Sequence, residues 1–243
     1  MEMNLYFAGI HHGDPFCVVN LRDYLDRIHA NITVKPDFIA VEWGQNCFET
    51  FVQEQRKIFG GFIRTDPLLK NLSLESIDLL TNLIGYEADT HKDIFPDVNT
   101  LWLDNYRNLD DRNLPNIAKN NFTRIKGVAE SLSRPISEDY LLTKISESCE
   151  WYWDKPSKDE IEEDFLLKLK YGEHDFDRDE TWANLIIDEI EKNGFDNFGI
   201  IIVGAEHTVF ESRYLANLLK KQSFQCDVKL MKYPYTQNKP SNR

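Results

Sequence analysis

Two motifs of the same form lie near opposite ends of the chain. The first is G-I-H-H at residues 9–12, and the second is G-A-E-H at residues 204–207. Each follows a run of apolar residues typical of a buried strand, and each places a glycine three residues before a histidine, His12 or His207. Because a glycine lets the backbone turn sharply or approach a ligand closely, we expect both histidines in turns after strands rather than in the core.

Carboxylates stand at comparable places. Glu42 ends the apolar run of P-D-F-I-A-V-E-W-G at residues 36–44, and Glu206 directly precedes His207. In an open parallel sheet, ligands bind outside the carboxyl ends of the strands. If these strands belong to one parallel sheet, the imidazoles and the carboxylates share one cleft, with His12, Glu42 and His207 at its centre.

Two imidazoles and a carboxylate suit two kinds of chemistry, and their spacing does not separate them. One is a divalent metal site, with manganese, cobalt or zinc held by His12, Glu42 and His207 and an open position for water; His11 and Glu206 are further potential ligands. The other is general acid–base catalysis without a metal, in which Glu42 fixes the tautomer of a histidine. Both predict a hydrolase that attacks an ester, amide or phosphoester of a small molecule or peptide with water.

Ordinary structural roles are open for some of these residues. His11 suits a polar loop, and Asp14 suits a turn before Pro15. Glu206 suits the first turn of a helix, where the helix dipole favours a carboxylate. A non-catalytic module that binds a small molecule or regulates a partner through the same cleft is the alternative to an enzyme.

The order of the expected elements predicts an α/β fold. Residues 4–10 read as a strand, residues 16–30 as a helix and residues 38–41 as a second strand, which implies a right-handed crossover between parallel strands. The C-terminal part repeats the pattern with a helix, a strand, a helix and a strand, at residues 178–194, 198–204, 207–222 and 226–235. Asp179 is the predicted N-cap of the first of these helices, and Gly194 its predicted C-terminal stop.

A long middle segment, residues 60–176, is expected to form a mainly helical lobe inserted into a single α/β domain of residues 1–243. The predicted fold is therefore a mostly parallel central sheet with flanking helices and this inserted lobe. Residues 91–121 are interrupted by prolines and asparagines. The aromatic stretch C-E-W-Y-W-D-K-P at residues 149–156 suits core packing or a platform on which a ligand stacks.

Composition argues against several classes of protein. The 243 residues carry a net charge of −13, whereas a general nucleic-acid binder needs a basic surface to neutralise phosphates. No apolar run approaches the ~18–20 residues of a membrane span, and the N-terminus has no signal peptide, so we expect a cytoplasmic protein without a membrane partner. The four cysteines form no C-x-x-C pair and are expected to be reduced. The P-loop, the dinucleotide fingerprint, H-E-x-x-H and the G-x-S-x-G nucleophile elbow are also missing.

Four short segments together resemble the TraB/Tiki/PrgY and erythromycin-esterase/ChaN-like superfamily. In that superfamily an early strand ends in G-x-x-H, a second strand ends in a glutamate, an R-D or R-N pair precedes a helix, and a late strand ends in G-x-x-H. The matching residues here are 9–12, Glu42, Arg178 with Asp179, and 204–207. In the middle segment, G-Y-E-A-D-T-H at residues 85–91 suits an additional inward-facing segment through Glu87 and His91.

The resemblance implies an α/β fold with a cleft and, in several branches, a hydrolase activity. That activity is metal-dependent in the Tiki peptidase branch and histidine-based in the esterase branch, while one branch resembles a haem-binding lipoprotein. It assigns the motif histidines to His12 and His207, the carboxylate to Glu42, and a contact with an anion or substrate to Arg178. The additional His11 leaves the choice between the two adjacent histidines open.

Overall fold

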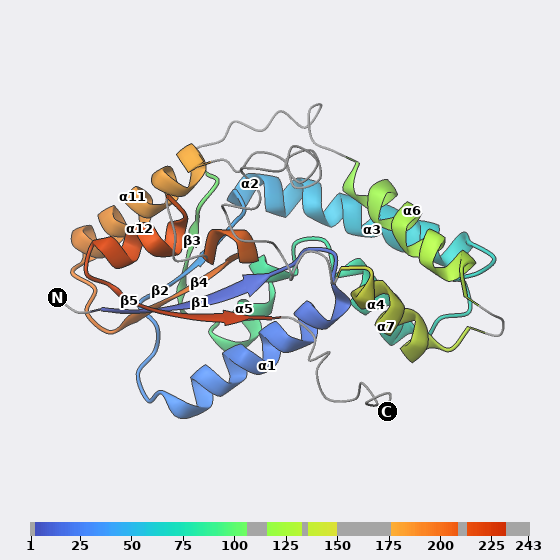
Figure 1. Cartoon of the computed structure of the whole chain (residues 1–243), viewed down its shortest axis with the longest axis horizontal. Coiled ribbons are helices and arrows are strands. Elements are labelled where there is room, and N and C mark those ends of the chain that lie inside the picture. The colour runs from blue at the N-terminus through green and yellow to red at the C-terminus, as the bar shows by residue number, and fades with distance from the viewer. Residues whose placement is uncertain (1–2, 106–115, 133–135, 150–175, 209–212, 232–243) are drawn as a thin grey trace, which may run out of the picture.

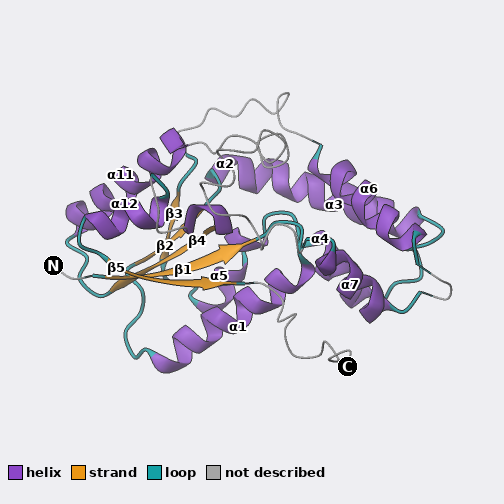
Figure 2. Cartoon of the chain, in the orientation of Figure 1, coloured by secondary structure: helices purple, strands orange, loops and turns teal. Residues whose placement is uncertain are grey.

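A five-stranded sheet forms the centre of the molecule, within the residues that the structure describes (Figures 1 and 2). The structure is a computed structural model, and it describes residues 3–105, 116–132, 136–149, 176–208 and 213–231. The strands are β1 (Asn4–Ile10), β2 (Phe38–Val41), β3 (Asn99–Trp102), β4 (Phe198–Gly204) and β5 (Gln225–Leu230). They lie in the order β3-β2-β4-β1-β5, and every neighbouring pair is parallel. The predicted α/β fold with a parallel sheet and flanking helices is confirmed.

Helices cover both faces of this sheet (Figure 1). Ala8 and Ile10 of β1 belong to the apolar core under α1 (Pro15–Asn31). Leu5 and Phe7, which alternate with them along the same strand, belong to a second core under α11 (Phe176–Asn193) and α12 (Leu215–Lys221). Strands that are apolar on both faces are what a parallel sheet between two helical layers requires.

Asp14 and Pro15 determine where the first helix, α1, begins. The Asp14 side chain accepts a hydrogen bond from the backbone N–H of Phe16 at 3.0 Å, and Pro15 occupies the first helical turn. An aspartate before a proline is a favoured start for a helix, because it caps an N–H group that the helix itself leaves without a partner. Asp14 is therefore the N-cap of α1 rather than a member of the cleft.

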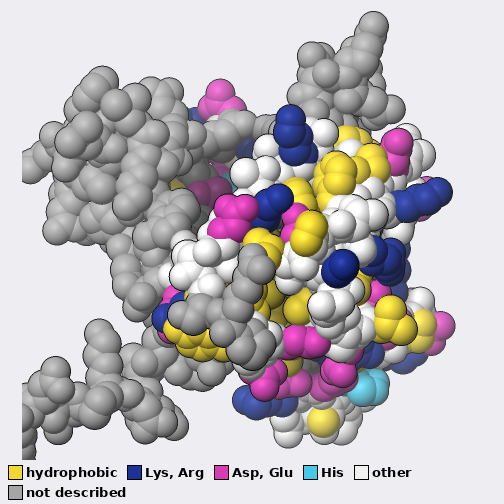
Figure 3. All heavy atoms as spheres, turned by 90° about the vertical axis from the view of Figure 1, so that its right-hand side faces the viewer, with side chains coloured by type: hydrophobic (Ala, Val, Ile, Leu, Met, Phe, Trp, Pro, Cys, Tyr) yellow, Lys and Arg dark blue, Asp and Glu magenta, His cyan; other side chains and the backbone are white. Residues whose placement is uncertain are grey.

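The remaining helices gather mainly at one end of the molecule, beyond the carboxyl ends of the strands (Figure 1). These are α2 (Gln45–Cys47), the π-helical turn η1 (Phe48–Val52), α3 (Gln53–Thr65), α4 (Leu74–Thr81), the 3-10 turn η2 (Tyr86–Ala88), α5 (Thr90–Ile94), α6 (Ile117–Glu130) and α7 (Glu138–Glu147). Basic, acidic and hydrophobic side chains are interspersed on the face that this end presents (Figure 3). The middle segment is not purely helical, because β3 lies within it and pairs with β2.

Two boundaries differ from those predicted. Helix α11 begins at Phe176, so Asp179 lies inside the helix and is not its N-cap. Helix α12 begins at Leu215, after the 3-10 turn η4 (Ala205–Thr208), so the predicted helix over residues 207–222 is too long. Gly194 has φ +64°, the left-handed conformation expected after a helix. The aromatic residues 151–153 lie outside the described part, and no helix within the described part is long and apolar enough to span a bilayer.

Candidate active site

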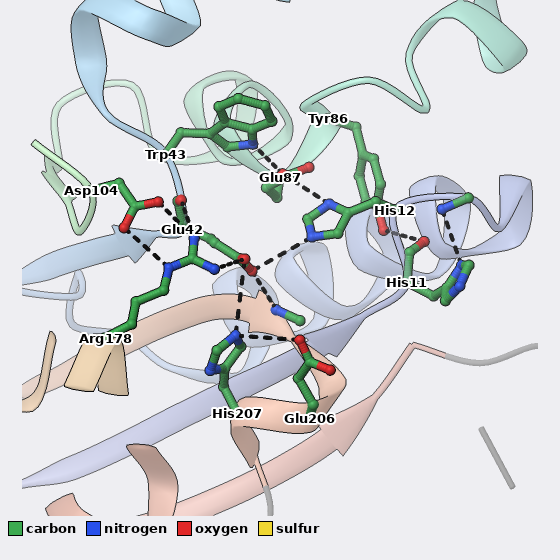
Figure 4. A network of polar contacts seen from close by, with 12 residues as sticks. His11, His12, Glu42, Trp43, Tyr86, Glu87, Asp104, Arg178, Glu206 and His207 are labelled. Atoms are coloured by element: carbon green, nitrogen blue, oxygen red, sulfur yellow. Dashed lines mark hydrogen bonds and ion pairs between the residues drawn. The ribbon is translucent and has the colours of Figure 1, made fainter. Parts of the chain in front are cut away.

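Four strands deliver polar side chains to one edge of the sheet (Figure 4). His12 follows β1, Glu42 follows β2, Asp104 follows β3, and His207 lies in η4 directly after β4. Because the strands are parallel, these four ends meet, and residues far apart in sequence surround one carboxylate, that of Glu42. The structure therefore brings together the two motif histidines, His12 and His207, and Glu42 from the end of β2.

Glu42 is held at the centre by the protein itself. Its Oε2 atom accepts a hydrogen bond from the backbone N–H of Gly204 at 2.8 Å, and its Oε1 atom lies 3.0 Å from Nη1 of Arg178. The two imidazoles approach it as well, with His12 Nε2 3.5 Å from Oε2 and His207 Nε2 3.9 Å from Oε1. The glycine of the second motif thus fixes the carboxylate that both histidines face.

His12 lies between two carboxylates. Its Nδ1 atom is 3.2 Å from Oε1 of Glu87, an oxygen that also accepts a hydrogen bond from the indole N–H of Trp43. Glu87 is fully buried, and its other oxygen has no hydrogen-bond partner among the described residues. His12 and Trp43 are therefore the groups that satisfy this buried carboxylate. The inward-facing position suggested by the sequence holds for Glu87.

His207 repeats this arrangement from the other side of Glu42. Its Nδ1 atom is hydrogen-bonded to the fully buried carboxylate of Asp179, whose second oxygen accepts from the backbone N–H of Leu215 at 3.1 Å. The imidazole also packs against the indole of Trp182, with ring centroids 4.8 Å apart. Each histidine is thus anchored at Nδ1 by a buried carboxylate and directs Nε2 toward Glu42.

The charges in this cluster shift the pKa values of its members. Burial lowers the pKa of His12, but the charge of Glu87 and the contacts with Glu42 outweigh it and raise that pKa well above 6.5. Burial likewise lowers the pKa of His207, while Asp179 and Glu42 raise it to a value above 6.5. Burial raises the pKa of Glu42, but Arg178 and the histidines hold it well below 4.5. The charges in the cluster therefore favour the ionised form of Glu42 and the protonated forms of His12 and His207.

Arg178 is committed to two carboxylates of the protein. Its Nε and Nη2 atoms donate to the two oxygens of Asp104 at 3.2 and 2.6 Å, and Nη1 pairs with Glu42. The guanidinium also stacks over Trp182, 4.2 Å from the ring centroid, and the indole N–H of Trp182 donates to Asp104 at 3.0 Å. These contacts make Arg178 a support for Glu42; its predicted contact with an anion or substrate stays a prediction.

The two adjacent histidines have different environments. The Nδ1 atom of His11 accepts a hydrogen bond from the backbone N–H of Gly13 at 3.0 Å, within its own turn. His12 instead faces the carboxylate cluster, so the geometry favours His12 as the motif histidine. Glu206 is 37 % exposed, with its Oε1 atom 3.7 Å from His207 Nε2 at the margin of the cluster. His91 lies elsewhere, with its Nε2 atom 2.8 Å from the hydroxyl of Thr100.

Gly9 shows why the first motif needs a glycine. A Cβ atom on Gly9 would lie 2.8 Å from a methyl group of Leu230 and 3.2 Å from the backbone of Ala205. The 3-10 turn that carries His207 therefore packs directly against β1 at this point. The glycine serves close approach between two backbone segments, and that approach brings the two motifs together.

A pocket of about 450 Å³ opens next to the cluster. Its inner wall includes His12, Glu42 and Arg178, whereas His207 is only 2 % exposed and lies behind Glu42. The His12 side chain lines this wall and is 45 % exposed. A ligand in the pocket would therefore meet His12 and Glu42 directly, and His207 only through Glu42.

A metal ion finds no ready set of ligands in this arrangement. Among the described residues, no group of three or more His, Cys, Asp or Glu side chains is placed to hold one. Both oxygens of Glu42 are engaged, one by Arg178 and one by the backbone of Gly204, and a guanidinium at 3.0 Å repels a cation. The predicted manganese, cobalt or zinc site on His12, Glu42 and His207 therefore stays a prediction.

Sequence reasoning missed several supports of the site. Asp104 follows a four-residue strand in a stretch that proline and asparagine interrupt, so no strand signal marked it. Trp182 resembles an ordinary core residue of α11, and only its position one turn after Arg178 hints at the stacking between them. The sequence predicts Asp179 as an N-cap, whereas in the structure it is the partner of His207.

Comparison of the chain with protein-family models, with curated proteins and with solved structures gives no match. The superfamily suggested by the motifs therefore stays a prediction, and the geometry of the cluster has to carry the functional argument.

Proposed function

We propose that the protein is a hydrolase in which His12 activates a water molecule for attack on an ester, amide or phosphoester. The observation that carries this proposal is the position of His12, an imidazole on the wall of a pocket, with Nδ1 3.2 Å from buried Glu87 and Nε2 facing Glu42. A carboxylate at one nitrogen fixes the ring and stabilises the imidazolium that forms when the other nitrogen takes a proton.

The proton follows a closed path in this mechanism. Deprotonated His12 takes a proton from water at Nε2 as the oxygen attacks the substrate, and it returns that proton to the leaving group when the scissile bond breaks. Glu42 stabilises the intervening imidazolium from 3.5 Å. Arg178, His207 and Asp179 act as positioning residues. Arg178 pairs with Glu42 on the pocket wall, and His207, which Asp179 anchors, faces Glu42 from behind that wall.

Matched histidine variants test this assignment on a panel of p-nitrophenyl esters, chromogenic peptides and phosphoesters. For any substrate that is turned over, H12Q should lower kcat/KM by about 10²- to 10⁴-fold, the usual contribution of a general acid–base group. H29Q is the control, since His29 lies on the exposed side of α1 away from the pocket. An H12Q protein that is folded and retains full activity would contradict the proposal.

The same assay distinguishes a metal-dependent mechanism from the histidine mechanism. With the histidine mechanism, dialysis against EDTA and addition of manganese, cobalt or zinc should leave kcat/KM unchanged. A rate that disappears with EDTA and returns with one of these ions, together with about one equivalent of that metal bound, would favour the metal site on His12, Glu42 and His207 instead.

A non-catalytic binding module is the second candidate, and the raised pKa of His12 favours it, because a protonated imidazole binds an anion but is not a base. A ligand that co-purifies unchanged and is released by H12Q, without hydrolysis of any substrate up to pH 9, would select this candidate over the enzyme.

A further inference from the structure

One face of helix α6 forms the outer wall of the pocket. Ile117, Asn120, Asn121 and Arg124 all line it, at the spacing that places side chains on a single face of a helix. The opposite part of the pocket is the inner wall with His12. A ligand that reaches His12 through this pocket would therefore lie against this face of α6.

Part of this outer wall is apolar. Ile117 of α6 lines the pocket together with Leu83 and Ile84, from the connection after α4, and with Trp43. A pocket of about 450 Å³ lies within the usual range of sites for drug-sized molecules, about 300–1,000 Å³. The pocket can therefore remove an apolar group of several carbon atoms from water, which is a favourable step.

Arg124 adds a positive charge to this wall. Its Nη2 atom donates to the carbonyl of Gly13 at 2.6 Å, and its Nη1 atom lies 3.4 Å from both the hydroxyl of Ser148 and the sulfur of Cys149. These acceptors are neutral, and Arg124 forms no ion pair with a described carboxylate. Arg178, by contrast, is matched by Asp104 and Glu42. Arg124 is thus held in place by neutral acceptors, and its positive charge can pair with an anionic ligand.

We infer that the substrate joins an apolar body, packed against Leu83, Ile84 and Ile117, to a negatively charged group that pairs with Arg124. This inference rests on the proposed function for the bond that is cut, but not for the binding itself. Anchoring by Gly13 pre-organises the guanidinium, so pairing costs little side-chain entropy, and a guanidinium matches the geometry of a carboxylate or phosphate.

Calorimetric titration with butanoate, hexanoate and octanoate, and with hexan-1-ol and octan-1-ol, tests both halves of the inference. Affinity should rise about fourfold per added methylene group, the value for transfer of CH₂ out of water, until the pocket is filled. Octanoate should bind at least about tenfold more tightly than octan-1-ol, because a hydrogen bond to a charged group outweighs one to a neutral group. Equal binding of the acid and the alcohol would overturn the role of Arg124, and no binding of octanoate would overturn the substrate class.

Three variants, one of them a control, keep this test decisive if the pocket is sensitive to change. R124Q should remove the difference between octanoate and octan-1-ol. I117D places a carboxylate on the pocket wall and should weaken octanoate at least about tenfold, whereas T123D adds the same charge to an exposed position of α6 that does not line the pocket and should leave it unchanged. Equal effects of I117D and T123D would overturn the inference.

The two proposals fail separately. If H12Q binds octanoate normally and no ester is hydrolysed by the wild type, the substrate class stands and the hydrolase proposal falls. If neutral esters are hydrolysed as fast as esters with a terminal carboxylate, and R124Q changes neither rate, the hydrolase proposal stands and the substrate class falls.

Discussion

His12 and His207 share a chemical arrangement but differ in access. Both are anchored at Nδ1 by a fully buried carboxylate, Glu87 or Asp179, and both direct Nε2 toward Glu42. Only His12 lines the pocket, while His207 is 2 % exposed. Under the proposed function, His12 exchanges a proton with a ligand and His207 has a structural role, and these two roles predict different pH effects.

The first prediction concerns the pKa of His12. Since Glu87 contributes the largest upward effect on it, E87Q should lower this pKa, because the amide removes the charge while the burial that lowers the pKa remains. The measurement is an NMR titration of the His12 Cε1–H signal, assigned with H12Q. In the wild type, kcat/KM for any substrate found should rise with pH through the same pKa, and in E87Q that rise should move to lower pH.

A His12 pKa that does not fall in E87Q would show that Glu87 does not control the protonation of the ring. Glu87 would then have no role in the proposed mechanism.

The second prediction concerns His207 and stability. A histidine whose folded pKa is raised above its unfolded value of about 6.5 adds stability in full below that value, and this stability is lost as pH rises through the folded pKa. D179N removes the partner that raises it. The free energy of unfolding by urea should therefore fall by about 1–3 kcal/mol at pH 6, the cost of breaking a buried hydrogen bond, and by less at pH 9. A deficit that is the same at both pH values would contradict the ion pair.

At the scale of elements, the ends of strands and helices decide where these side chains lie. Two glycines illustrate this for helices. Gly194 has φ +64° after α11, whereas Gly61 lies within α3, and both have open space where a Cβ atom would lie. The two positions therefore differ in backbone conformation and not in steric room.

The third prediction follows from this pair. G194A should lower the free energy of unfolding by about 1 kcal/mol, because an alanine in the left-handed region is strained. G61A should raise it by about 0.5–1 kcal/mol, because alanine favours a helix interior over glycine. Urea denaturation of both proteins measures the two changes. A stabilising effect of G194A would show that the end of α11 can adopt another conformation without cost.

Sequence alone predicted the elements whose signals are local and strong. The buried strands β1, β2 and β4 and the residues that follow them stand out because apolar runs end abruptly in His12, Glu42 and His207. Strand β3 does not, since four residues at the sheet edge with partial burial carry little pattern. The link between Asp179 and His207 could not be predicted either, because it depends on how α11 packs against η4 in three dimensions.

At the scale of the whole molecule, parallel topology and net charge act together on a ligand. The parallel strands collect their ends into one pocket, and the pocket carries the cation Arg124. The full chain, however, has a net charge of −13, so an anion approaching from solvent is repelled at long range and attracted only at the site. The repulsion by the net charge acts over a longer range than the attraction by Arg124, so a change in salt concentration affects the two differently.

The last prediction uses this difference. The screening length falls from about 30 Å at 0.01 M salt to about 8 Å at 0.15 M, so added salt weakens the repulsion by the whole molecule more than the contact with Arg124 inside the pocket. Octanoate should therefore bind about two- to threefold more tightly at 0.15 M than at 0.01 M sodium chloride, a change smaller than 1 kcal/mol. Octan-1-ol, which has no charge, should change little over the same range. Calorimetry at the two salt concentrations measures both affinities. An octanoate affinity that falls with salt would mean that the local field of the pocket, rather than the net charge, governs the approach of an anion.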